Sequence, residues 1–305
     1  AISQMRGSMQ LALTLVSPDP DAAALAAAAL PAALAGVRAS VKEPRMLGPG
    51  ALDLAVEGEA IAPVRAAVET ALAKWPVDAC VQPAEGRRKQ ILVADMDSTI
   101  INVECLDELA DFAGVKDQVS AITERAMRGE LAFEGALRER VAMLKGLGLD
   151  ALQKAYDERV RLNPGARTFV RTMAANGARC LLVSGGFTFF TSRVAQAAGF
   201  HEDRANTLHE DGASLAGTVG EPILGREAKL AALESEARRL GLPLSQTLAI
   251  GDGANDLAMI EAAGLGVAYR AKPIVAGQAD AKVDHADLTA LLYFQGYSAD
   301  EFVID

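Results

Sequence analysis

Short apolar runs that end in polar residues constrain the fold of this chain more than any other feature. They lie at 91–95 (ILVAD), 179–185 (RCLLVSG) and 247–252 (TLAIGD), and a fourth run follows at 265–269 (LGVAY). Helical patterns separate these runs, and strands that alternate with helices are typical of a parallel sheet covered on both faces. The sequence therefore predicts a Rossmann-like, doubly wound α/β domain over residues 91–305.

The connection between the first two runs is too long for a single crossover helix. Residues 96–178 separate them, and 103–160 has the pattern of several helices. We therefore expect an inserted helical cap at about residues 103–165. A second excursion is expected at 206–219, where an Asp-Gly turn between short extended runs predicts a hairpin.

The N-terminal part has a different pattern. Residues 9–83 alternate between strand-like and helical stretches in the order strand, helix, strand, strand, helix, strand. This order is that of a ferredoxin-like α+β domain. Residues 84–90 (AEGRRKQ) are polar and charged, and they are expected to link it to the larger domain.

Composition excludes several classes of function. The chain has 305 residues, 50% of them hydrophobic, and a net charge of −10. Binding nucleic acid usually needs a clustered basic face, so nucleic acid is not expected as a partner. No apolar run approaches the roughly 20 residues that span a bilayer, so no membrane segment is expected. Cys80, Cys105 and Cys180 form no CxxC pair, which favours reduced thiols in a cytoplasmic protein.

The residues that could take part in catalysis or binding lie at the ends of the predicted strands. These residues are Asp95 and Asp97 after the first run, Ser184, Gly185 and Gly186 at the second, and Asp252, Asn255 and Asp256 at the third. Parallel strands that are neighbours would bring them to one pocket. Clustered carboxylates repel each other unless a cation lies among them, and Mg²⁺ prefers such oxygen ligands.

The glycines at the second strand end and a lysine before the third run are suited to binding an anion. Residues without a Cβ let backbone N–H groups approach an anion closely, and Lys229, on an expected helix before the third run, offers a point charge to phosphate. Taken singly, each motif is also typical of a turn, a loop or a solvated helix face. The ordered set, one member at each strand end, indicates a site for a metal and a phosphate.

These residues resemble the haloacid dehalogenase-like superfamily, and within it the phosphoserine phosphatases. The resemblance covers residues 88–295 and rests on DMDSTI (95–100), LLVSGGF (181–187), Lys229 and IGDGANDLAMI (250–260). The stretch AMRGELAFEGALRERVAMLKG, at 126–146, is similar to the cap segment of phosphoserine phosphatases. The N-terminal unit resembles the ACT-like extensions of some bacterial members.

The resemblance implies an enzyme that hydrolyses O-phospho-L-serine to L-serine and phosphate, the last step of serine biosynthesis. Asp95 is implied as the nucleophile that forms an aspartyl-phosphate. Asp97 is implied as the general acid that protonates the leaving alkoxide and then as the base that activates water. Mg²⁺ is the implied cofactor, with Asp95, the backbone carbonyl of Asp97, Asp252 and Asp256 as its ligands or supporting residues.

The resemblance also implies how the substrate is bound. The phosphoryl oxygens would be held by Ser184, Gly185, Gly186, Lys229 and Asn255. Glu104 would bind the ammonium of phosphoserine and Arg140 its carboxylate, beside Met127 and Phe133. A core position for Met127 and Phe133 is the alternative, although six residues separate them, which does not match one helical face. For Arg140 the alternative is a solvated charge.

Two functional alternatives stay open from the sequence. The phosphoryl group could pass to another hydroxyl, such as that of homoserine, rather than to water. The N-terminal unit is expected to regulate the enzyme by binding an amino acid or to form a homodimer, with a structural appendage as the alternative.

Overall fold

The computed structural model describes residues 7–304, so residue 305, the end of the predicted larger domain, lies outside the described residues. The chain folds into two compact units. The first unit contains the described residues up to Lys89 and those from Asp280 onward, and the second contains Gln90–Ala279. Each unit is described by itself below.

The second unit is built on a parallel sheet. Its strands are β6 (Ile91–Ala94), β7 (Arg179–Phe187), β8 (Glu202–Asn206), β11 (Thr247–Gly251) and β12 (Leu265–Tyr269). They pair in the order β12-β11-β6-β7-β8, and every pair is parallel. β6, β11 and β12 are buried along their whole length, as expected for strands covered on both faces. The predicted α/β fold with a parallel sheet is confirmed.

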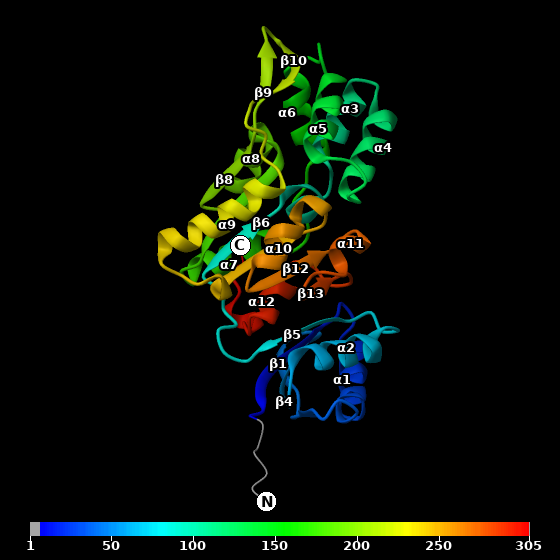
Figure 1. Cartoon of the computed structure of the whole chain (residues 1–305), viewed down its shortest axis with the longest axis vertical. Coiled ribbons are helices and arrows are strands. Elements are labelled where there is room, and N and C mark those ends of the chain that lie inside the picture. The colour runs from blue at the N-terminus through cyan, green and yellow to red at the C-terminus, as the bar shows by residue number, and fades with distance from the viewer. Residues whose placement is uncertain (1–6, 305) are drawn as a thin grey trace, which may run out of the picture. The chain divides into compact units, whose positions relative to one another are not determined.

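Helices cover both faces of this sheet (Figure 1). They are α7 (Ala166–Ala175), α8 (Thr188–Ala198), α9 (Arg226–Leu240), α10 (Leu257–Ala262) and the short α11 (Pro273–Ala276). Ile91 and Val93, alternate residues of β6, share a buried apolar cluster with residues of α9 and α10. Cys180 projects from the opposite face of β7, where its thiol lies 3.9 Å from the carbonyl oxygen of Val170 in α7. α7 therefore covers the face opposite to α9 and α10.

Four helices lie between β6 and α7, in the stretch where the sequence predicts a cap. They are α3 (Cys105–Phe112), α4 (Lys116–Met127), α5 (Phe133–Ala142) and α6 (Asp150–Arg159), grouped at one end of the unit in Figure 1. We call these four helices the cap. The predicted hairpin is also present: β9 (Leu208–Asp211) and β10 (Ser214–Val219) pair antiparallel. Backbone hydrogen bonds join Leu215 of β10 to Gly146 and Leu147 after α5, so the hairpin adjoins the cap.

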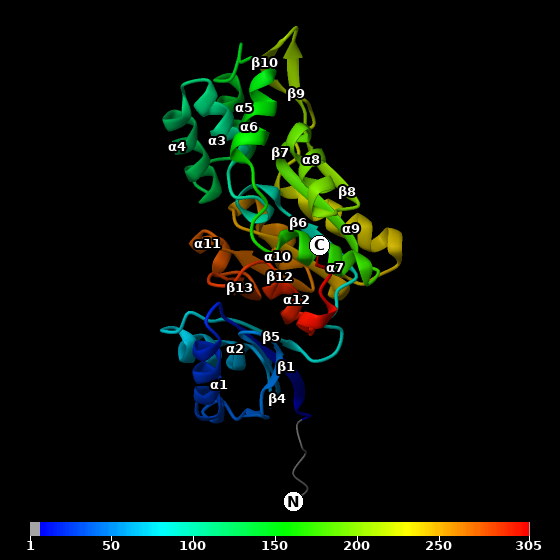
Figure 2. The ribbon, with the colours of Figure 1, turned by 180° about the vertical axis from the view of Figure 1, so that it is seen from behind.

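The first unit has an antiparallel sheet with two helices on one face (Figure 2). Leu11, Leu13 and Leu15 alternate along β1 and pack in one buried cluster with Leu30 and Val68 of the two helices. Strands β2-β4-β1-β5 pair in this order, and β3 also pairs with β4. The elements are β1 (Met9–Val16), α1 (Pro20–Ala35), β2 (Ser40–Val41), β3 (Arg45–Gly48), β4 (Ala51–Gly58), α2 (Ile61–Leu72) and β5 (Asp78–Pro83).

The C-terminal segment belongs to the first unit, which differs from the predicted division into 9–83 and 91–305. It contains β13 (Ala281–Val283) and α12 (Ala290–Phe294). The side-chain amide of Gln82 donates to the carbonyl oxygen of Phe294 at 2.6 Å. The carboxylate of Asp78 accepts hydrogen bonds from the backbone N–H groups of residues 284–286. Buried polar groups of β5 thus find their partners in a segment about 200 residues away along the chain.

Two further sequence-level expectations concern the whole chain. Among residues 7–304, no helix combines the length and the apolar composition needed to cross a bilayer. Cys80, Cys105 and Cys180 are free thiols and all three are buried.

Candidate active site

Three neighbouring strands of the second unit end at the same edge of the sheet with polar residues. Asp95 directly follows β6, Asp252 directly follows β11, and Ser184 lies in the last part of β7. Because β11, β6 and β7 are parallel neighbours, their carboxyl ends meet, as the sequence predicts. The edge of the sheet therefore brings together Asp95 and Asp252, which lie 157 positions apart along the chain.

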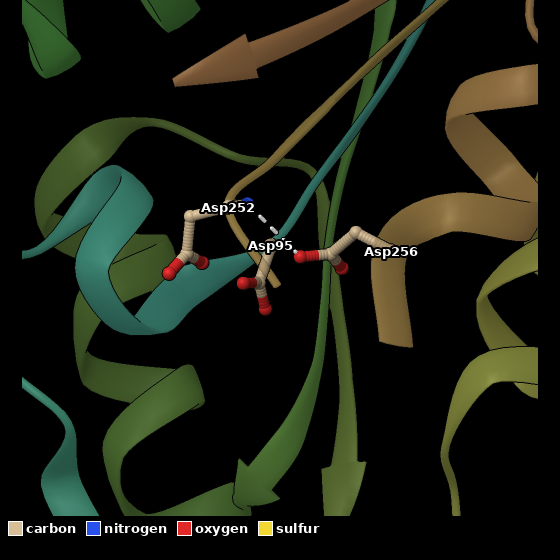
Figure 3. A group of neighbouring side chains, drawn as sticks. All are labelled: Asp95, Asp252 and Asp256. Carbon is tan, nitrogen blue, oxygen red and sulfur yellow. Dashed lines mark hydrogen bonds between the residues drawn. The ribbon is translucent and has the colours of Figure 1, made fainter. Parts of the chain in front are cut away.

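A cluster of buried carboxylates occupies this edge. Asp95, Asp252 and Asp256 each offer an oxygen, and these oxygens lie within 4.8 Å of one another (Figure 3). The hydroxyl of Thr99 donates to Oδ1 of Asp252 at 3.2 Å. Oδ2 of Asp252 is buried without a hydrogen-bond partner in the described part of the chain. An unsatisfied carboxylate oxygen beside two further carboxylates is a donor set that fits a hard divalent cation.

Lys229 lies against the same cluster. Its Nζ is 2.8 Å from Oδ1 of Asp95 and 2.6 Å from Oδ1 of Asp256, and the side chain is fully buried. Burial by itself would lower the pKa of Lys229, but the carboxylates of Asp256 and Asp95 outweigh it and raise the pKa. Lys229 is therefore a fixed cation that holds the two carboxylates in place.

Asp256 also orders the loop after β11. Its Oδ2 accepts a hydrogen bond from the backbone N–H of Asp252 at 3.1 Å (Figure 3). It also accepts one from the backbone N–H of Gly253 at 3.2 Å. Burial, and then the neighbouring charge of Asp95, raise the pKa of Asp256 to about 7. For Asp252, burial and the nearby carboxylates of Asp95 and Glu104 raise the pKa well above its usual range. Such shifts are typical of carboxylates that a cation would neutralise.

Asp97 has different surroundings from Asp95. It lies on the turn Met96–Ile100, in which Ser98 adopts a positive φ of 56°. Burial, followed by the charges of Glu104 and Asp95, raises the pKa of Asp97 well above its usual range. Its Oδ1 is buried and has no hydrogen-bond partner in the described chain. A raised pKa favours the protonated form of a carboxyl group, and that form can donate a proton.

Except for Lys229, the predicted anion-binding residues line a cavity with Asp95 and Asp97. These are Ser184, Gly185, Gly186 and Asn255. The hydroxyl oxygen of Ser184 accepts the backbone N–H of Gly186 at 2.9 Å, so the turn is compact. Oδ1 of Asn255 is buried and makes no hydrogen bond within residues 7–304. The cavity thus combines carboxylates with a hydroxyl, an amide and glycine backbone.

The cap closes this cavity from the other side. Glu104, Met127, Phe133 and Arg140, the residues predicted to select the substrate, all line it. The packing over the sheet edge is close. A Cβ on Gly185 would lie 2.4 Å from Cζ of Phe133, and one on Gly253 would lie 2.6 Å from Sδ of Met127. The cavity volume is only ≈ 30 Å³, which is room for a water molecule or two.

Sequence reasoning missed several residues at this site. Ser98 donates to Oε1 of Glu104 at 3.0 Å, and Thr99 donates to Asp252; both lie within the DMDSTI motif, which could have indicated them. Nζ of Lys272 lies 3.8 Å from Oδ2 of Asp252. Lys272 follows β12 on a loop, where no periodic pattern distinguishes it. Leu106, Leu137 and Phe187 also line the cavity.

Comparison with known proteins identifies similar chains. The sequence model of the haloacid dehalogenase-like hydrolases matches residues 92–261. A phosphoserine phosphatase of Streptomyces coelicolor is 43% identical over 253 residues, which are 82% of this chain and 62% of that protein. A phosphoserine phosphatase of Polaromonas sp. is 45% identical over 209 residues, which are 67% of this chain and 88% of that protein. The chain thus spans less than two thirds of the Streptomyces relative and most of the Polaromonas one.

A solved structure supports the same likeness in three dimensions. A phospho-aspartyl intermediate analogue of phosphoserine phosphatase aligns with a TM-score of 0.65 and 37% identity. The alignment covers 68% of this chain and 99% of that one. The similarity therefore extends over a whole related chain.

Proposed function

The chain belongs to the haloacid dehalogenase-like hydrolase family, and from this premise we propose that it hydrolyses O-phospho-L-serine to L-serine and phosphate with Mg²⁺ as cofactor. The observation that carries the proposal is one cavity with two functional sides. Asp95, Asp97 and Ser184 line it from the sheet edge. Arg140 of the cap and Glu104, which directly precedes α3, line it from the other side. A phosphomonoester that also bears an ammonium and a carboxylate matches both sides chemically.

Asp95 is the proposed nucleophile. Its carboxylate would attack phosphorus and displace the serine alkoxide, which gives an aspartyl-phosphate. Covalent catalysis of this kind divides one difficult displacement into two easier ones. Lys229, 2.8 Å from Oδ1 of Asp95, fixes the orientation of the carboxylate. A related structure is described as a phospho-aspartyl intermediate analogue, which supports this route.

Asp97 is the proposed general acid and base. Its raised pKa provides a proton for the departing alkoxide in the first step. The carboxylate then formed would take a proton from the water that hydrolyses the aspartyl-phosphate. One residue thus serves both displacements because the first leaves it in the protonation state that the second needs.

The carboxylate cluster is the proposed Mg²⁺ site. Asp95 and Asp252 would hold the cation together with the backbone carbonyl of Asp97, and Asp256 would act directly or through water. Oδ2 of Asp252 supports this assignment, because it accepts no hydrogen bond within the described residues and the cation that faces it, Nζ of Lys272, is 3.8 Å away. When bound, the cation would offset the negative charge of the carboxylates and of the phosphoryl oxygens.

The remaining residues of the cavity would bind the substrate. The phosphoryl oxygens would be held by Ser184, Gly185, Gly186 and Asn255, together with Lys229, which contacts Asp95 but does not line the cavity. Glu104 would bind the ammonium and Arg140 the carboxylate, with Met127 and Phe133 over the substrate. A cavity of ≈ 30 Å³ is too small for phosphoserine, so Phe133 and its helix would have to move for substrate to enter.

The first unit is proposed as an ACT-like module. Its sheet order and its two helices support that likeness. It would bind an amino-acid effector such as serine or join two chains in a homodimer, in a cytoplasmic enzyme. Transfer of the phosphoryl group to homoserine is less favoured than hydrolysis, because the similar proteins named above are phosphatases.

Phosphate release over a panel of phosphomonoesters tests the proposal. L-Phosphoserine should be the preferred substrate, EDTA should abolish its hydrolysis, and Mg²⁺ should restore it. Preference for another monoester would refute the substrate assignment, and undiminished activity in EDTA would refute the metal. Added homoserine that becomes phosphorylated would identify a phosphotransferase.

A further inference from the structure

Arg140 is a buried cation in the cap. Only 4% of its surface is exposed, although it lines the cavity. Burial of a charged group is unfavourable unless hydrogen bonds or an opposite charge compensate for it. Within residues 7–304, no carboxylate forms a salt bridge with Arg140, although the charges of Glu104, Asp107 and Asp97 act on its guanidinium. Its hydrogen bonds must therefore fix it in place.

Two hydrogen bonds hold the guanidinium. Nε donates to the carbonyl oxygen of Ala136, one turn earlier on α5, at 3.0 Å. Nη1 donates to the hydroxyl oxygen of Thr123 on α4 at 2.9 Å. Nη2 has no hydrogen-bond partner in the described part of the chain, and an arginine offers five N–H donors. Several N–H donors of Arg140 thus remain for a ligand in the cavity.

Thr123 is in turn oriented by Asp107 of α3. Its hydroxyl lies 2.6 Å from Oδ1 of Asp107 and 3.1 Å from the carbonyl oxygen of Val119. A hydroxyl has one hydrogen to donate, and the charged and nearer oxygen of Asp107 is the better acceptor. With its hydrogen directed to Asp107, the hydroxyl presents a lone pair to Arg140. The chain Asp107–Thr123–Arg140 therefore connects three cap helices with consistent donors and acceptors.

The position of Thr123 in its helix supports a specific role. The buried face of α4 consists of Val119, Thr123, Ala126 and Met127. Thr123 is the only polar member of this face, and threonine is a weaker helix former than alanine or leucine. Neither helix formation nor apolar packing accounts for a hydroxyl at this position.

We propose that Thr123 and Asp107 are positioning residues that fix the Arg140 guanidinium so that it selects substrates with a carboxylate. The inference rests on the proposed phosphoserine phosphatase activity and deepens it. Nε and Nη1 set the plane of the guanidinium, and a planar fork binds a carboxylate well only in one plane. Loss of the Thr123 hydroxyl would free the plane to rotate and leave a buried N–H without an acceptor.

The test compares two substrates that differ only in the carboxylate. O-Phosphoserine and O-phosphoethanolamine share the ammonium and the phosphomonoester. Thr123→Val should raise the KM for phosphoserine about tenfold or more, with a much smaller change in kcat. The ratio of kcat/KM for phosphoserine to that for phosphoethanolamine should fall by a similar factor. Thr123→Ser, which keeps the hydroxyl, should restore the ratio.

A matched control separates positioning from structural support. Thr191 on α8 is also buried and donates its hydroxyl to an aspartate, Asp203, at 2.8 Å, and it does not line the cavity. Thr191→Val should retain the wild-type substrate ratio even where its melting temperature falls. If Thr123→Val does not fold, Asp107→Asn gives the same test, because it preserves side-chain volume and weakens the acceptor.

The outcomes are distinct. A wild-type substrate ratio in Thr123→Val or Asp107→Asn would overturn the inference. Equal losses on both substrates would also overturn it, because they would mean a purely structural role. Failure of the wild-type enzyme to hydrolyse phosphoserine would instead overturn the proposed function, and this is measured before any variant.

Discussion

Asp95 and Asp97 are separated by one residue, and the structure gives their carboxyl groups different surroundings. Asp95 contacts the cation of Lys229 at 2.8 Å. Asp97 has no such partner, and burial with the charges of Glu104 and Asp95 raises its pKa. A paired carboxylate is suited to attack phosphorus, and a carboxyl group that keeps its proton is suited to protonate a leaving group.

This difference predicts a dependence on the leaving group. Asp97→Asn should lower kcat/KM for phosphoserine by about 10²–10⁴-fold, the usual contribution of general acid catalysis. The loss should be smaller for p-nitrophenyl phosphate, because p-nitrophenolate leaves without a proton. Steady-state phosphate release with both substrates checks this.

Asp95→Asn provides the control for this prediction. It removes the proposed nucleophile, so turnover of both substrates should be lost whatever the leaving group. Equal losses for both substrates in Asp97→Asn would contradict the role of Asp97 as a proton donor. Retained turnover in Asp95→Asn would contradict the assignment of the nucleophile.

The buried carboxylates also predict a pH dependence. The pKa of Asp256 is raised to about 7, against about 3.9 for an unfolded aspartate. Between these values the folded protein binds more protons than the unfolded one, so the stability of the metal-free protein should fall as pH rises from about 4 through 7. Mg²⁺ competes with these protons, so the rise in melting temperature on adding Mg²⁺ should be larger at pH 8 than at pH 6.

Calorimetry with and without Mg²⁺ at both pH values measures this difference. Asp252→Asn removes a proposed ligand, and it should reduce the Mg²⁺-dependent rise at pH 8. An increase in melting temperature that is the same at pH 6 and pH 8 would show that protons and the cation do not compete at this cluster.

The sequence predicts some site residues and misses others for a physical reason. Asp95, Asp97, Ser184 and the residues of the third run stand at strand ends, where local patterns reveal them. Thr123 acts through contacts with two other helices, and these depend on how the cap packs. A single hydroxyl in an otherwise apolar helical face gives no signal of its own.

At the scale of elements, the same limit applies to strands. β6, β7, β11 and β12 lie where apolar runs predict them. The sequence does not predict β8, because EDRAN is polar and contains no apolar run; in the structure only its last residue is buried. β8 lies at the edge of the sheet and pairs only with β7 among the described residues. Its backbone hydrogen bonds, and not an apolar side-chain pattern, make it a strand.

The contact between α5 and the end of β7 predicts how tightly the cap closes. A Cβ at position 185 would lie 2.4 Å from Cζ of Phe133, closer than van der Waals contact allows. Gly185→Ala should therefore displace the Phe133 ring and lower kcat/KM for phosphoserine about tenfold or more. Phosphate release measures the loss.

A double variant identifies the cause of this loss. If the clash with the ring is responsible, Phe133→Ala combined with Gly185→Ala should lose less than the sum of the single variants. Gly135→Ala, in the same helix as Phe133, has no atom within 4 Å of the added Cβ and should leave activity unchanged. Additive losses would show that the glycine acts independently of the ring.

At the scale of the whole molecule, the first unit contains both ends of the described chain. The sequence predicts its helices α1 and α2 and the strands β1, β4 and β5, but it predicts a single strand where β2 and β3 lie. It does not predict the C-terminal segment, because the link is a set of polar contacts between distant residues. Gln82 and Asp78 appear in the sequence as ordinary polar residues near the end of a strand. Their burial, and the backbone groups of residues 284–286 and 294 that satisfy them, emerge only from the fold.

These contacts predict that β5 stabilises the C-terminal segment within the first unit. Asp78→Ala would leave up to three backbone N–H groups, those of residues 284–286, without their acceptor, and should lower the free energy of unfolding by about 1–3 kcal/mol. Urea denaturation measures this, with the exposed Asp21→Ala of α1 as a control that should change little. A wild-type unfolding curve for Asp78→Ala would mean that residues from Asp280 onward do not depend on the contacts of Asp78. Deletion of residues 1–85 would then test for an amino-acid effector without disturbing the C-terminal segment. If Asp78→Ala is destabilised, deletion of residues 1–85 would also disturb the C-terminal segment. Serine as an effector must then be tested by its binding to the full chain and by point substitutions.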